Sequence, residues 1–140
     1  MKNMKLLLCM LCMVILCCSC GWFGDQEYIC EFEKVKSIEI VRLENFDGEK
    51  YEYEYTVLAQ ITDKATFVDR LNKVETSINW GEPRILNMQE LVIRIEYFNG
   101  DYDLMNWRAQ NFYHSGTIQI GYFVFDDEEF NALISDYMPQ

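Results

Sequence analysis

Two turn dipeptides constrain the fold of this chain more than any other feature of its 140 residues. Asn99-Gly100 is the strongest short signal for a β-hairpin, because both residues tolerate the positive φ angles of a type I′ turn. Asp47-Gly48 is a second hairpin signal. Strand-like segments flank both dipeptides, so the sequence predicts antiparallel strand pairs.

Alternation of apolar and polar residues locates the strands. It is clearest over 51–61, where tyrosines and aliphatic residues occupy one face and polar residues the other, a pattern that marks a half-buried strand. Helical spacing of apolar residues predicts amphipathic helices over 65–74, capped by Thr62 or Asp63, and over 126–137, which begins with acids. Further strands are predicted over 35–43, 89–98, 101–108 and 117–125, and a loop over 109–116. Residues 76–88 show no regular pattern.

These elements follow one another in the order ββ-α-βββ-α. The order predicts an α+β domain, with a mostly antiparallel sheet of about five strands and two helices on one face. The sequence contains no internal repeat or low-complexity tract.

The central hairpin predicts a candidate binding surface. If Asn99 and Gly100 are the two turn residues, Phe98 pairs with Asp101, and one face of the hairpin is apolar enough for the core. Tryptophan, methionine and arginine are enriched in interface cores, so we predict that residues of the opposite face bind a partner. The alternative is that another segment, such as 77–88, covers them. The predicted partner-binding residues are Val92, Arg94, Met105 and Trp107.

The same register sets two acids opposite each other. Glu96 would face Asp103, an unfavourable pair of like charges unless a cation relieves it. Arg94, which lies diagonally to Asp103, is the simple source of that cation, and a bound metal ion is the more demanding one. We therefore predict no metal site.

The first twenty residues have the composition of an export signal. Lys2 and Lys5 precede thirteen unbroken apolar residues, and Ser19 and Cys20 follow. A charged start, an apolar stretch of about 7–15 residues and a small residue at the cut define a secretory signal, whereas a membrane span needs about 20 apolar residues. The segment resembles the signal peptides of bacterial lipoproteins, in which the cysteine after the cut is acylated.

The resemblance implies that Cys20 is the lipidation site. Cys18, and after it Cys17, are the alternatives, because the family has leucine three places before its cysteine and Cys17 stands there in this chain. Two or more acyl chains hold a protein stably on a membrane. The protein is then expected outside the cytoplasm, anchored by lipid to the cell membrane or outer envelope. A plain secretory signal or an uncleaved anchor would be the other explanation.

Cleavage before Cys20 removes residues 1–19, leaves 121 residues and changes the formal net charge from −11 to −13. The mature chain is expected to form a membrane-proximal tether over 20–30 and a single α+β domain over 31–140. Its acidity argues against binding of nucleic acid and of anionic lipid, since both need clustered basic residues. It is compatible with a cationic partner, or simply with a solvated acidic surface.

Few residues suggest catalysis or a cofactor, and neither is predicted. His114 is the sole histidine and adjoins Ser115, but neighbours in sequence seldom form a nucleophile–base pair, so His114 is expected on the surface of a loop. Motifs typical of zinc, calcium or phosphate binding do not occur. Cys30 is expected as a small, half-buried apolar residue, without a disulfide partner unless Cys20 escapes acylation.

The sequence therefore predicts a lipid-anchored protein that is not an enzyme and that binds a protein partner. One alternative is an immunity or inhibitor protein against a cationic toxin or enzyme. Another is a glycan-binding module that uses the tyrosines of 51–55 with Trp80 and Trp107. A hydrolase that uses His114 with a carboxylate is a further alternative, and an exposed sheet face could also form a homodimer.

Overall fold

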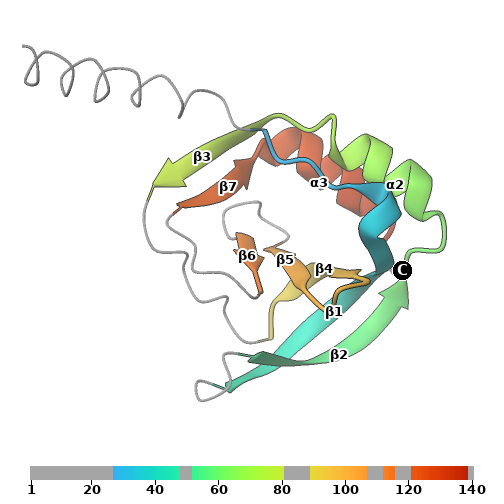
Figure 1. The fold of residues 1–140 in the computed structure, drawn as a ribbon, viewed down its shortest axis with the longest axis vertical. Coiled ribbons are helices and arrows are strands. Elements are labelled where there is room, and N and C mark those ends of the chain that lie inside the picture. The colour runs from blue at the N-terminus through green and yellow to red at the C-terminus, as the bar shows by residue number, and fades with distance from the viewer. Residues whose placement is uncertain (1–26, 48–51, 81–88, 107–111, 116–120, 139–140) are drawn as a thin grey trace, which may run out of the picture.

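The computed structural model describes residues 27–47, 52–80, 89–106, 112–115 and 121–138 (Figure 1). Five strands form one antiparallel sheet in the order β2-β1-β4-β5-β6, and β3 pairs with β7 in a second, two-stranded sheet. The elements are η1 (Phe32–Lys34), β1 (Val35–Asp47), β2 (Glu52–Gln60), α2 (Lys64–Leu71), β3 (Thr76–Trp80), β4 (Leu91–Tyr97), β5 (Tyr102–Asn106), β6 (Phe112–His114), β7 (Gly121–Phe125) and α3 (Asp127–Ser135).

The predicted class, an α+β domain with mostly antiparallel strands, is confirmed, but the predicted order ββ-α-βββ-α is wrong. Five strands, not three, lie between the two α-helices in the described part of the chain. The sequence missed β3, which is short and ends beside Gly81 and Pro83, and β6, which has only three residues. Because β3 is present, β7 pairs with it and does not join the larger sheet.

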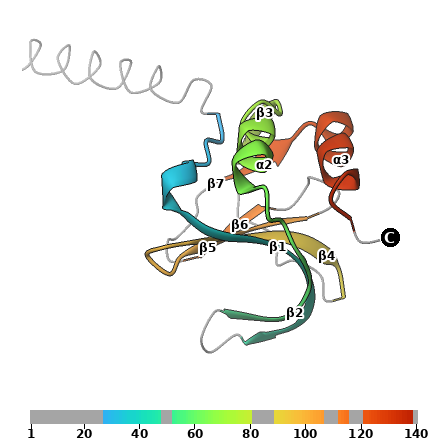
Figure 2. The ribbon, with the colours of Figure 1, turned by 90° about the vertical axis from the view of Figure 1, so that its right-hand side faces the viewer.

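Both α-helices begin where their caps predict. The carboxylate of Asp63 accepts a hydrogen bond from the backbone N–H of Thr66 at 3.2 Å, and that of Asp126 accepts one from Glu129 at 2.9 Å. Figure 2 shows α2 and α3 on the same side of the larger sheet. Their predicted apolar stripes are buried in the main core, through Phe67, Val68 and Leu71 of α2 and Phe130, Leu133 and Ile134 of α3.

The N-terminal segment before η1 belongs to this core, although the sequence placed it in the tether. Tyr28 is 6% exposed and Cys30 only 2%. The backbone of Cys30 exchanges two hydrogen bonds with the side-chain amide of Asn72, at 2.8 and 2.9 Å. The Tyr28 ring makes edge-to-face contacts, at centroid distances of 5.3 to 5.5 Å, with Phe112, Phe123 and Phe125.

The β4–β5 hairpin has a three-residue loop, which corrects the predicted two-residue turn. The carbonyl of Tyr97 accepts from the N–H of Gly100 at 3.1 Å, and the N–H of Tyr97 donates to the carbonyl of Asp101 at 2.9 Å. Gly100 has φ +93°, whereas Asn99 lacks the positive φ that a type I′ turn would require. A type I turn followed by a glycine at positive φ is the usual form of such a loop.

The longer loop shifts the register by one residue and turns β5 over, because strand side chains alternate between faces. Ile93 therefore faces Met105, and Ile95 faces Asp103. Glu96 lies opposite Tyr102, so the predicted like-charge pair of Glu96 with Asp103 is wrong.

The face of the sheet turned away from the helices has a smaller core of its own. β1 and β2 are long, and two register shifts bend the pair, one at Leu58 of β2 and one at Glu44 of β1. Figure 2 shows the end of β1 and the start of β2 curling beneath the rest of the sheet. The bend closes a second buried cluster, which consists of Val41, Leu43, Tyr53, Val92 and Leu104.

Candidate functional site

The four predicted partner-binding residues do not share one exposed surface. Val92 and Arg94 are 2% and 7% exposed and lie on the face of the second cluster. Met105 is 1% exposed and lies in the main core, because the register shift turns it to the opposite face. Trp107 lies outside the described residues. The exposed binding surface that the sequence predicts is therefore absent at Val92, Arg94 and Met105.

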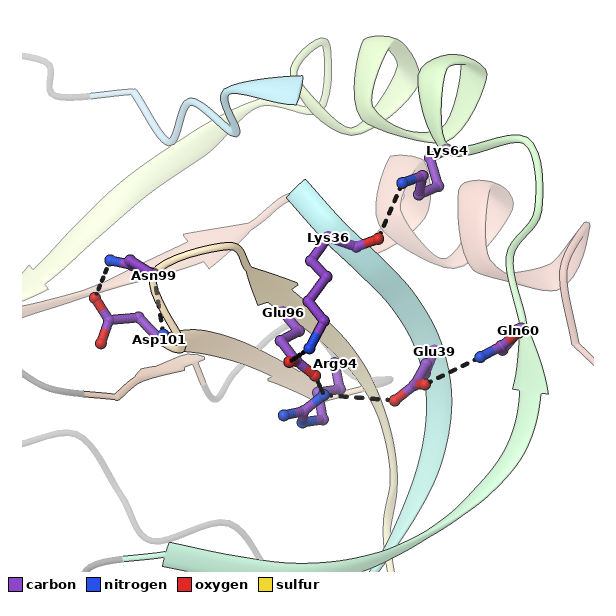
Figure 3. Close-up of polar contacts among 8 residues, drawn as sticks. All are labelled: Lys36, Glu39, Gln60, Lys64, Arg94, Glu96, Asn99 and Asp101. Carbon is purple, nitrogen blue, oxygen red and sulfur yellow. Dashed lines mark hydrogen bonds and ion pairs between the residues drawn. The ribbon is translucent and has the colours of Figure 1, made fainter. Parts of the chain in front are cut away.

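Arg94 is the centre of a chain of ion pairs between β1 and β4, which a hydrogen bond extends to β2 (Figure 3). Its guanidinium donates to Glu96 at 2.7 Å and contacts Glu39 at 3.5 Å. Lys36 binds the other oxygen of Glu96 at 2.6 Å, and the side-chain amide of Gln60 donates to Glu39 at 3.3 Å. Both cations lower the pKa of Glu96 by hydrogen bonding to its carboxylate, Lys36 more than Arg94.

Two tyrosine rings complete the surroundings of Arg94. The guanidinium carbon lies 4.7 Å from the ring centre of Tyr55 and 5.0 Å from that of Tyr102, within cation–π range. Tyr53, which lies two residues before Tyr55 on β2, is buried against Phe46 and Tyr113. The tyrosines considered as a glycan platform are thus engaged in packing where the structure describes them.

A second polar cluster surrounds the carboxylate of Asp103, which is 2% exposed. The hydroxyl groups of Tyr28 and Tyr97 both donate to its Oδ2, the first at 2.8 Å. Its Oδ1 lies 2.5 Å from Nδ1 of His114. The thiol of Cys30 adjoins the Tyr97 hydroxyl at 4.0 Å. Segments far apart in the sequence therefore converge on one buried acid, which the predicted register had placed opposite Glu96 on the outer face.

The acid–imidazole contact favours the charged form of His114. Hydrogen bonding to Asp103 raises the pKa of the imidazole, and this effect exceeds the opposing effect of burial. His114 is the end of β6, with a side chain 28% exposed, so the predicted loop position is replaced by a strand position. A buried carboxylate that orients a histidine is also an arrangement found in acid–base catalysis.

The other groups of the cluster are poor nucleophiles. Burial raises the pKa of the Cys30 thiol to about 11 and raises that of Tyr97 well above its usual value. The thiol therefore stays protonated near neutral pH, and a protonated thiol is unreactive. The hydroxyl of Ser115 accepts from the backbone N–H of Tyr102 at 2.7 Å, away from the Asp103–His114 contact. The described residues thus supply an oriented histidine without an activated nucleophile.

Two members of the cluster, Tyr97 and His114, line a pocket of about 540 Å³, here called the N-terminal pocket. One wall is the N-terminal segment, and the other is the β4–β5 turn. The backbone N–H of Phe98 donates to the carbonyl of Lys34 at 3.0 Å and joins the two walls. The pocket is lined by Ile29, Glu31, Glu33, Lys34, Tyr97, Phe98, Asn99, Asp101 and His114.

A second pocket, of about 490 Å³, lies along β3. Its lining runs from Asn72 to Ile78 with Glu27, Tyr28 and Trp80. Within the ranges that the structure describes, no three His, Cys, Asp or Glu side chains are grouped to hold a metal ion. None of the helices in those ranges is long and apolar enough to cross a membrane.

We expect Arg94→Ala to destabilise the fold, because it leaves the buried Glu39 without its counter-ion and Glu96 with Lys36 alone. Loss of one partner of a buried ion pair costs about 3 kcal/mol. The matched control is Arg70→Ala, whose pair with Asp136 is solvent-exposed and should cost less than about 1 kcal/mol. Urea unfolding of the full chain measures both, and equal losses would contradict the structural role of Arg94.

We expect His114→Gln to reduce stability in a pH-dependent way. Because the folded-state pKa of His114 is raised above its ordinary 6.5, its charge contributes fully below that value and the contribution is lost as pH rises through the folded pKa. The difference in free energy of unfolding between wild type and variant should therefore be largest below about pH 6.5 and should shrink as the pH rises further. A difference that stays constant would show that His114 does not titrate against Asp103.

Comparison with known proteins does not identify a family for this chain. No protein-family model matches the chain, and no curated protein or solved structure matches it either. The function is therefore best approached through the N-terminal pocket and the residues that hold it together.

Proposed function

We propose that this protein is a lipoprotein, acylated at Cys20 and held outside the cytoplasm, whose domain binds a protein partner without catalysing a reaction. The N-terminal pocket is the observation that carries the proposal. The two most exposed large apolar side chains among the described residues, Phe98 at 70% and Ile29 at 69%, both line it. Exposed apolar surface of this kind marks interaction sites.

The position of the pocket in the chain supports an anchored role. Ile29 follows the proposed lipidation site, Cys20, by nine residues. An extended chain spans at most about 3.6 Å per residue, so the pocket would stay within about 32 Å of the acylated cysteine. Such a tether confines the pocket to the layer next to the membrane and favours partners that are also held there.

The state of the buried cluster supports binding over catalysis. Three side chains already occupy both oxygens of Asp103. The Cys30 thiol is 2% exposed and has a raised pKa. A hydrolase would instead need a nucleophile within reach of the oriented His114 and donors for the developing negative charge.

An immunity or inhibitor protein against a cationic toxin or enzyme is the second candidate, favoured by charge. Loss of Lys2 and Lys5 leaves a net charge of −13 on the mature chain. The electrostatic field of a chain with this charge steers cationic proteins toward the domain, and added salt weakens it. Binding that persists undiminished at high salt would count against this candidate.

We expect Cys20→Ala to move the protein from the membrane fraction to the soluble fraction, because the acyl chains would have no site of attachment. Cys18→Ala is the matched control and should leave the protein in the membrane fraction. Fractionation of the producing cells, followed by immunoblotting, measures both. Retention of the Cys20→Ala protein would move acylation to Cys18 or Cys17.

We expect crosslinking of the full chain in its native membranes to recover a partner that Phe98→Ala loses, because that variant removes the largest exposed side chain of the pocket. Val57→Ala is the control, since Val57 is also exposed, at 43%, but lies on β2. Recovery of this protein alone would indicate a homodimer and contradict a separate partner.

A further inference from the structure

We infer that the N-terminal pocket receives a lysine or arginine side chain of the partner protein, carried on an otherwise apolar segment. The inference rests on the proposed binding role and adds the chemistry of the partner. It follows from three properties of the pocket: its exposed apolar rim, its excess of carboxylates and its fixed walls.

The apolar rim sets the first requirement for the partner. Ile29 and Phe98 stand on opposite walls, one on the N-terminal segment and one on the β4–β5 turn. Both expose more than two thirds of their surface. A partner segment that covers them must itself offer apolar side chains, since burial of apolar surface stabilises the complex by about 25 cal/mol per Å².

The carboxylates set the second requirement. Glu31 is bound to Lys34 at 2.8 Å, so these two charges largely cancel. The charge of His114 is balanced by Asp103. Glu33 and Asp101 then leave the pocket with a negative balance. Asn99 donates to the Asp101 carboxylate at 2.6 Å (Figure 3), so this carboxylate is held in place before a ligand arrives.

Size and rigidity set the third requirement. A volume of about 540 Å³ lies within the range of pockets that hold small ligands, so it has room for a lysine or arginine side chain and for part of the segment that carries it. The bond from Phe98 to Lys34 joins the two walls, and the bond from Tyr28 to Asp103 secures the N-terminal segment to β5. A preformed site loses less entropy on binding.

A basic protein segment fits these properties better than the membrane surface does. Anionic lipid attracts clusters of lysine and arginine, whereas this pocket offers Glu33 and Asp101 beside its apolar rim. The long apolar stem and charged end of lysine or arginine match an apolar rim with carboxylates beside it. Phe98 can also face the cation directly, because aromatic rings attract cations.

Fluorescence anisotropy of a labelled six-residue peptide of alternating lysine and leucine tests this inference. The binder is the full acylated chain in phosphatidylcholine nanodiscs, and a glutamate–leucine peptide is the control probe. The double variant Glu33→Gln/Asp101→Asn should weaken binding of the basic peptide about fivefold to tenfold. Phe98→Ala should weaken it by a similar factor, and Val57→Ala should not.

A second double variant distinguishes the effect of the net charge of the protein from the effect of the two pocket carboxylates. Glu54→Gln/Glu128→Gln removes the same net charge from exposed positions on β2 and α3 and should change affinity less than about twofold. Equal losses in the two double variants, or equal binding of both peptides, would overturn the inference.

Two further outcomes keep this inference distinct from the proposed function. A crosslinked partner that depends on Phe98, together with no peptide affinity, would overturn the basic-side-chain inference and leave the binding role in place. Sedimentation of the Cys20→Ala chain with phosphatidylcholine vesicles, lost in Phe98→Ala, would assign the apolar rim to the membrane and overturn the inference.

Discussion

The buried carboxylate of Asp103 is the constraint on which the arrangement of this domain depends. It sits opposite Ile95 on the central strands, and it accepts hydrogen bonds from Tyr28 and Tyr97 while pairing with His114. A buried charge is tolerated only when it is paired and hydrogen-bonded. The N-terminal segment, the end of β4 and strand β6 must therefore all reach the same point, and the pocket between them is a consequence of that convergence.

The helices and the pairing of neighbouring strands could be predicted from the sequence because their signals are local. Asp63 and Asp126 cap α2 and α3 as their positions predict, and the hairpin around Gly100 forms. The register of that hairpin could not be predicted, since it depends on whether one residue or two in the turn have positive φ. Asn99-Gly100 permits both, and the choice exchanges the faces of every residue in β5.

The candidate site was hidden for the same reason. Tyr28 and Asp103 are 75 residues apart, and no spacing rule connects them. An acid between Tyr102 and Leu104 within a strand was the one available signal, and the wrong register assigned it to the outer face. Arg94 was predicted to bind a partner on an exposed face, but β2 bends beneath the sheet and Arg94 is buried, which the sequence pattern of either strand alone does not indicate.

The attachment of Tyr28 and Cys30 to the domain has a mechanical consequence. Besides the bond from the Tyr28 hydroxyl to Asp103 of β5, a pull on the chain from its N-terminal side meets two sets of backbone contacts. These are the bond from the Tyr28 N–H to Thr76 at 3.1 Å and the paired bonds between Cys30 and Asn72. Tension would thus be divided among the start of β3, the turn that ends α2 and strand β5. The first part of the molecule to yield would be the N-terminal wall of the pocket, so a stretched chain would release its ligand before it unfolds.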